Sequence, residues 1–95
     1  MKFMEIIRVQ AAIDCEKGLK KRILTLNDEI RKGPDIKGLV ECLNLQQASV
    51  PGSFAVHLSW EMKTPSTLGS PLGLTLIEAL KGLGLVNHSV WINQT

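Results

Sequence analysis

Two histidines set among carboxylates are the residues of this chain whose chemistry could support catalysis. His57, Ser59 and Glu61 have the residue types of a hydrolytic triad or a metal site. However, positions 53–62 alternate strictly between apolar and polar residues, which predicts a β-strand. In a strand, His57 and Glu61 lie roughly 13 Å apart at ~3.3 Å per residue. They cannot share a proton or a metal ion, so the pattern argues against a hydrolase built on them.

His88 has a more suitable partner. It alternates with valines in a strand predicted over 85–93, so it points to the apolar side of the sheet. Glu5 falls on the same side of a strand predicted over 3–12, which we expect to be the neighbouring strand. A carboxylate that orients an imidazole in an apolar pocket makes a fair general base for a phenolic proton. The alternative is a satisfied polar pair at the sheet edge, because alternation does not fix strand register.

Composition narrows the class of protein. Ninety-five residues with 44% apolar content indicate one globular domain over 1–95. A net charge of +2 is too weak to indicate binding to nucleic acid or to a membrane surface. No apolar run approaches the ~20 residues of a membrane helix. Cys15 and Cys42 form no metal-binding pair, and the first residues do not resemble a signal peptide, so we expect free thiols in the cytoplasm and no metal.

Two helices and four strands must position these residues. Strands are predicted over 3–12, 39–46, 53–62 and 85–93. The first helix should begin at Asp14 as N-cap and end at Gly33 as a left-handed cap, followed by proline. Its apolar stripe comprises Leu19, Ile23, Leu24, Leu26 and Ile30. The second helix should begin with Ser70 as N-cap and Pro71 at its first position.

The order β-α-β-β-α-β predicts an α+β, ferredoxin-like antiparallel sheet in spatial order four, one, three, two, with both helices on one face. In the second strand, Leu39, Leu43 and Leu45 should face the helices. The opposite face would still carry many apolar side chains: Met4, Ile6, Val40, Leu85 and Trp91. Such a patch requires a partner, and we expect a homodimer through this sheet face.

The chain resembles the antibiotic biosynthesis monooxygenase family of the dimeric α+β barrel superfamily. The resemblance rests on Gly38, on the phenylalanine-led strand 54–61, and on the helix that begins at 70–72 and continues through 76–80. It covers essentially the whole chain. It implies a homodimer and a pocket between the sheet and the helices in each subunit. It also implies oxidation of quinol-like or other aromatic substrates by dioxygen, without metal or flavin.

The resemblance also implies roles for particular residues. Trp60 matches the family's pocket tryptophan, which could stack on a flat substrate and donate its indole N–H, although plain core packing is the alternative. Leu58 and Leu76 would line the same pocket and bind a small hydrophobic ligand. The chain has no tyrosine, which excludes family members with a tyrosine proton shuttle as templates. The haem-degrading branch of the family is similar in using an asparagine on the first strand and a histidine on the second helix. Neither residue is present here in 3–12 or 66–83, so haem degradation is disfavoured.

The sequence therefore predicts a cofactor-free, monooxygenase-like protein with His88 and Glu5 as the catalytic pair. The alternative is a non-catalytic dimeric module that binds a small molecule or assembles with another protein. Whether the chain is an enzyme stays open at this point, as does the identity of the substrate.

Overall fold

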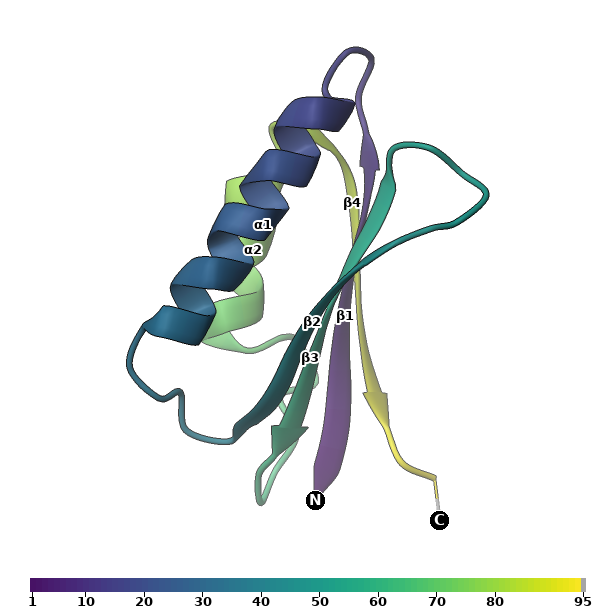
Figure 1. Cartoon of the computed structure of the whole chain (residues 1–95). Helices are drawn as coiled ribbons and strands as arrows, with labels where there is room; N and C mark the ends of the chain where they lie inside the picture. Colours follow the sequence, from purple (N-terminus) through teal and green to yellow (C-terminus); the bar gives the residue numbers. More distant parts are fainter. Residues whose placement is uncertain (95) are drawn as a thin grey trace.

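In the computed structural model, which describes residues 1–94, the two helices cover one face of a four-stranded antiparallel sheet (Figure 1). The elements follow in the order β1 (Lys2–Ala11), α1 (Glu16–Lys32), β2 (Leu39–Gln46), β3 (Ser53–Glu61), α2 (Pro71–Leu80) and β4 (Gly84–Ile92). The sheet order is β2-β3-β1-β4. The ferredoxin-like α+β fold and the strand order predicted from the sequence are both confirmed, with β1, β3 and β4 differing by one residue at their ends.

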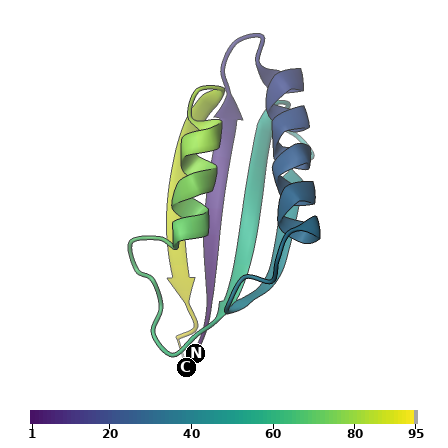
Figure 2. The ribbon, with the colours of Figure 1, turned by 90° about the vertical axis from the view of Figure 1, so that its left-hand side faces the viewer.

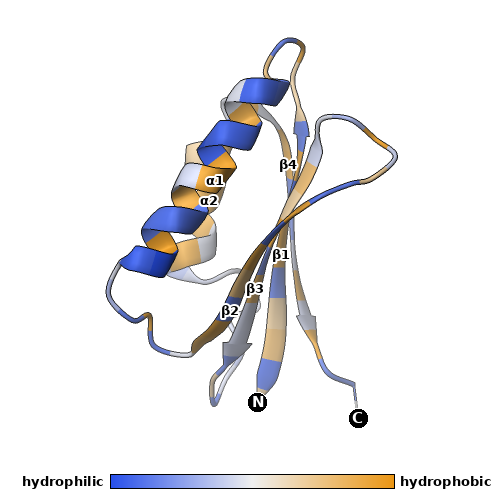
Figure 3. Ribbon diagram, in the orientation of Figure 1, coloured by the Kyte–Doolittle hydropathy of each residue, from blue (hydrophilic) through white to orange (hydrophobic). Residues whose placement is uncertain are grey.

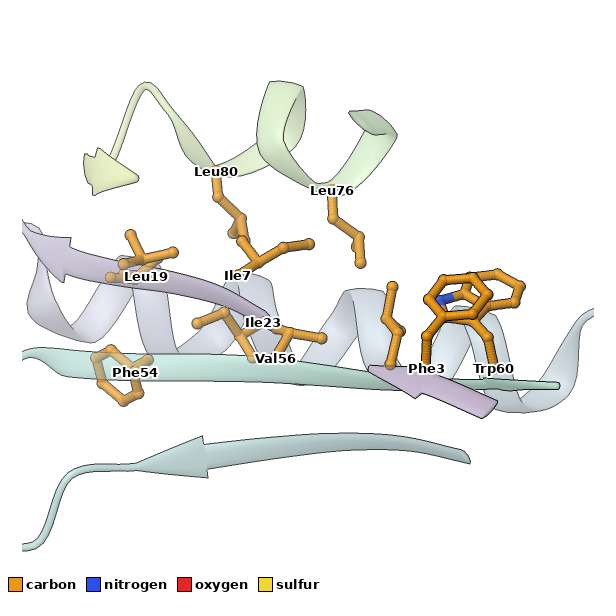
Figure 4. Close-up of a cluster of buried hydrophobic side chains, with 11 residues drawn as sticks. Phe3, Ile7, Leu19, Ile23, Phe54, Val56, Trp60, Leu76 and Leu80 are labelled. Atoms are coloured by element: carbon orange, nitrogen blue, oxygen red, sulfur yellow. The ribbon is translucent and has the colours of Figure 1, made fainter. Parts of the chain in front are cut away.

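The core lies between the helices and the sheet because every second residue of β1 and β3 is buried, and all of these face the helices. Their helix-facing side chains are almost fully buried, and Leu58 and Ile7 have no exposed surface. Leu76 and Leu80 of α2 point down onto this layer, and Phe3 stacks on Trp60 (Figure 4). Figure 2 shows α2 in front of β1 and β4, with α1 beside it. The site residues on β1 and β4 therefore lie beneath α2.

Strand β2 does not face the core as predicted. Its register against β3 shifts between Leu39 and Glu41, which marks a β-bulge at Val40. One extra residue reverses the two faces of the strand beyond the bulge. Cys42 is therefore paired with buried Leu58 on the helix side, whereas Leu43, predicted in the core, is paired with His57 and is 42% exposed.

The face of the sheet away from the helices is called the open face below. It carries the large side chains of Met4, Leu43, Leu45, Leu85 and Trp91, each more than one-third exposed. Leu45 joins this face for the same reason as Leu43, although it too was predicted in the core. The bulge thus makes the open face more apolar than the sequence predicts. Figure 3 shows the contrast with α1, whose outer surface is largely hydrophilic.

Helix α1 differs from its prediction at both ends. Its N-cap is Cys15, without a side-chain cap hydrogen bond, while Asp14 has φ 64° and completes a turn in which the Cys15 N–H bonds to the Ala12 carbonyl at 3.0 Å. Gly33 is extended (φ −77°, ψ −179°) and is not left-handed. Leu24, predicted in the apolar stripe, is 52% exposed. The remainder of the stripe does pack against the core.

Candidate active site

A fully buried carboxylate lies at the centre of the site. Glu5 of β1 has no exposed surface, and its neighbours on the same face of β1 are the apolar residues Phe3 and Ile7. Removing an ionised carboxylate from water costs many kcal/mol unless hydrogen bonds and charge partners replace the solvent. Glu5 therefore needs polar partners from the surrounding elements, and four polar groups contact it.

Each carboxylate oxygen of Glu5 has two hydrogen-bond contacts. Oε1 accepts from Trp60 Nε1 at 3.2 Å and from Ser70 Oγ at 2.6 Å. Oε2 accepts from the Ser70 backbone N–H at 3.0 Å and lies 2.7 Å from His88 Nε2. These four contacts fill the roughly four lone-pair positions of a carboxylate. Glu5 thus ties β3, the start of α2 and β4 to β1.

The register of β4 against β1 brings His88 to Glu5. His88 is paired with Ile7, so it points to the helix side two pairs away from the Glu5–Val90 pair, on the same face as Glu5. Its side chain is 17% exposed, whereas that of Glu5 is wholly buried. The structure therefore brings together the two residues that the sequence predicted as a pair, and it leaves the imidazole at the rim of the core.

Trp60 also belongs to the cluster, through a contact that the sequence did not predict. Its indole N–H, expected to be a donor to a substrate oxygen, bonds to Glu5. Its ring is 4% exposed and stacks on Phe3, with ring centroids 6.2 Å apart and planes at 15°. Leu58 and Leu76, predicted to line a pocket, are 0% and 2% exposed in the packed core.

Ser70 was predicted only as a helix cap, and its part in the site was missed. Its Oγ accepts from the Gly73 N–H at 2.9 Å, as an N-cap should, and donates to Glu5. The contact joins residues 65 positions apart, so local sequence could not reveal it. Pro71 at the first helical position did locate the cap itself.

Two glycines make room for the cluster. A Cβ on Gly73 would overlap Glu5 Oε2 and lie 2.5 Å from its Cδ. Gly69, with φ +106°, lies against the imidazole, since a Cβ there would be 2.5 Å from His88 Cε1. Any side chain at either position would push Glu5 or His88 out of place. The paired glycines around Ser70 were the signal in the sequence that something large packs against this turn.

The other residues considered for chemistry lie apart from this cluster. His57 faces away from the helices, opposite Ile6, and Glu61 contacts the N-terminal amine at 3.5 Å. Within residues 1–94, no group of three or more potential ligands is arranged to hold a metal ion. Cys15 and Cys42 are free thiols. No helix among the described residues is long and apolar enough to cross a membrane.

Cys42 is nevertheless chemically distinct. Its thiol donates to Asn27 Oδ1 at 3.3 Å, beneath α1. Burial raises the pKa of the Cys42 thiol, and the nearby Arg31 guanidinium lowers it by a smaller amount. A thiol with a raised pKa is mostly protonated near neutrality and is a poor nucleophile. We therefore interpret Cys42 as a residue packed between β2 and α1, not as a nucleophile.

The open face is hollowed near Trp91. A depression of about 470 Å³ lies there, bordered among others by Met4, Val40 and Ser59. It lies on the opposite side of the sheet from His88. Its apolar border belongs to the surface that the sequence predicted as a dimer interface.

The fold is thus a four-stranded ferredoxin-like sheet with a buried carboxylate–imidazole pair under its second helix. No family model matches the chain, and no curated protein matches its sequence. Solved structures match it over nearly its full length. SnoaB, a cofactor-independent oxygenase from Streptomyces nogalater, aligns with a TM-score of 0.66 and 15% identity, covering 99% of this chain and 94% of that one.

Two further structures have a similar extent of agreement. Rv0793 from Mycobacterium tuberculosis aligns with a TM-score of 0.71 and 16% identity, covering 100% of this chain and 97% of that chain. A protein from Deinococcus radiodurans, described as a candidate antibiotic biosynthesis monooxygenase, aligns with a TM-score of 0.70 and 18% identity, covering 98% and 93%. The chain has the fold of the antibiotic biosynthesis monooxygenases, in agreement with the resemblance seen in its sequence.

Proposed function

We propose that this protein is a cofactor-independent monooxygenase that oxidises a small aromatic or quinol-type substrate with dioxygen. The observation that carries the proposal is the buried Glu5 carboxylate bonded to the partly exposed His88 imidazole. This arrangement orients a base at the edge of an apolar core. The fold shared with SnoaB, a cofactor-independent oxygenase, supports the same reaction class.

In this proposal His88 removes a proton from an acidic O–H or activated C–H group, and the resulting anion is electron-rich enough to reduce dioxygen. For a substrate with an activated CH2 group, one O2 converts CH2 to C=O and releases one water, so the substrate supplies all the electrons. Glu5 stabilises the imidazolium formed during proton transfer. Trp60, Leu58 and Leu76 lie in the packed core behind this pair, so a substrate would reach them only if α2 moved away from the sheet.

Oxygen consumption with a panel of quinols and anthrone-like aromatics tests the proposal. We expect native protein to raise consumption above background for at least one compound, and His88→Ala to lower the rate by about 10²-fold or more, the usual contribution of a general base. His57→Gln is the matched control because His57 lies on the opposite face of the sheet. If no compound raises consumption, the enzyme proposal fails. Calorimetric titration with the same panel would then test a binding module.

We also propose that the protein is a homodimer packed through the open face, and that it works in the cytoplasm with both thiols reduced. The support for the dimer is the number of exposed large apolar side chains on that face, including Trp91 at 60% and Leu85 at 81% exposure. Isolated surface leucines are common, but a group of this size on one sheet face usually marks an interface. Sedimentation as a well-behaved monomer at micromolar concentration would contradict the dimer.

A further inference from the structure

The hydrogen-bond directions around Glu5 are largely fixed by chemistry. The Trp60 indole N–H and the Ser70 backbone N–H can only donate. The Ser70 hydroxyl has one hydrogen, and its Oγ already accepts from Gly73 N–H, so that hydrogen is directed to Glu5 Oε1 at 2.6 Å. Three donors therefore hold Glu5 as an acceptor. The fourth contact, from His88 Nε2 to Oε2, is then completed when Nε2 carries the hydrogen.

We propose that Ser70 is a positioning residue that fixes neutral His88 as its Nε2–H tautomer, and that Nδ1 is the nitrogen that takes the substrate's proton. Ser70 acts by holding both oxygens of Glu5, one with its hydroxyl and one with its backbone N–H. The assignment of proton transfer to Nδ1 rests on the proposed function. The tautomer assignment does not, because it follows from the hydrogen bonds to an ionised Glu5 carboxylate.

The surroundings of His88 indicate that Nδ1 is reachable. Among residues 1–94, Nδ1 has no hydrogen-bond partner, and no fully buried side-chain nitrogen or oxygen is left without one. Nδ1 must therefore contact solvent. Gly69 lies beside Cε1, the carbon between the two ring nitrogens. A Cβ on Gly69 would also lie 3.3 Å from Nε2, so the Gly69 turn covers the Cε1–Nε2 edge of the ring, and the substrate would reach Nδ1 where the imidazole contacts solvent.

Few other charges can influence the imidazole. Glu5 of β1 is the ionisable group that contacts it. On α2 and its C-terminal end, Glu78 and Lys81 pair with each other at 2.7 Å and are well exposed. Arg8 of β1 alternates to the open face. The tautomer is therefore expected to respond to the Glu5–Ser70 contact more than to distant charges.

Nitrogen-15 NMR of histidine-labelled protein tests the proposal, over a pH series that reaches the neutral imidazole. Native protein should show a single Nε2–H tautomer for His88. Ser70→Ala should populate both tautomers, Ser70→Thr should restore the native pattern by keeping a hydroxyl cap, and Thr75→Ala should leave it unchanged. Thr75 is the matched control because its hydroxyl bonds only to the Pro71 carbonyl on the exposed side of α2.

Phenol is the probe for the reactive nitrogen, and its addition should shift the Nδ1 resonance more than that of Nε2. A native Nδ1–H tautomer overturns the proposal even if Ser70→Ala does not fold. If folded Ser70→Ala keeps the native tautomer, the proposed role of Ser70 is wrong. If phenol shifts the Nε2 resonance more, or shifts neither resonance, the proposed role of Nδ1 is wrong. If the tautomer is as expected but no aromatic raises oxygen consumption, the proposed function fails while the tautomer assignment stands.

Discussion

Replacing Gly73 by alanine gives the sharpest test of the buried cluster. Alanine at a helix interior position normally stabilises a protein by roughly 0.5–1 kcal/mol relative to glycine. At Gly73 the added methyl would overlap Glu5 Oε2 and lie 2.5 Å from Cδ and 2.9 Å from Oε1. The carboxylate must move, and disrupting a buried, hydrogen-bonded charge costs about 3–5 kcal/mol. We therefore expect a net destabilisation of about 2–4 kcal/mol, the difference between these two effects.

Gly18 provides a matched control, since both glycines occupy the third position of their helices. A Cβ on Gly18 meets nothing within 4 Å, so Gly18→Ala should stabilise the protein slightly. Urea unfolding measures both variants, and their effects should have opposite signs. In a Glu5→Ala background, Gly73→Ala should lose most of its cost because the methyl enters vacated space. A Gly73→Ala protein as stable as the native one would refute this account of the site.

Two further predictions concern the thiols and the open face. Because burial raises the pKa of Cys42, a thiol reagent should modify it more slowly than Cys15 in native protein, and at equal rates after unfolding. Its neutral thiol stabilises the fold below the ordinary thiol pKa of about 8.5, and that contribution falls as pH rises through the folded value. Urea unfolding should therefore show that Cys42→Ser loses less stability at alkaline pH than the native protein does. An equal loss of stability with pH in the two proteins would contradict this role of Cys42. Trp91→Lys should shift sedimentation equilibrium toward monomer, whereas Leu68→Lys, on an exposed loop, should not; equal behaviour of the two would contradict the proposed interface.

Most of the fold could be predicted because its strongest signals are local. Strict alternation in β3, looser alternation in β1 and the Ser70-Pro71 start of α2 supported the predicted element order and the placement of the core. Strand β2 shows where local reasoning fails. A bulge depends on pairing with another strand, so the alternation of residues 39–46 could not reveal that Val40 has no paired residue on β3.

The pairing of His88 with Glu5 was predicted because both residues interrupt an apolar face in neighbouring strands. Alternation along the strands could not predict which residues of the helices contact Glu5. Ser70 reaches Glu5 only because α2 crosses over β1, a contact set by packing. Gly73 was the clue, since a glycine at the buried third position of a helix weakens the helix unless another group needs its space.

The surroundings of Glu5 support the catalytic role proposed above. A buried charged group that serves only to hold a fold together can often be replaced by an apolar residue with little loss, or even a gain, of stability. Here the carboxylate is fully satisfied, yet one of its partners is an imidazole that is itself 17% exposed. A structural cluster needs no titratable group at its rim. A carboxylate that holds an imidazole from behind, at the rim of an apolar core, is the arrangement that the proposed proton transfer would use.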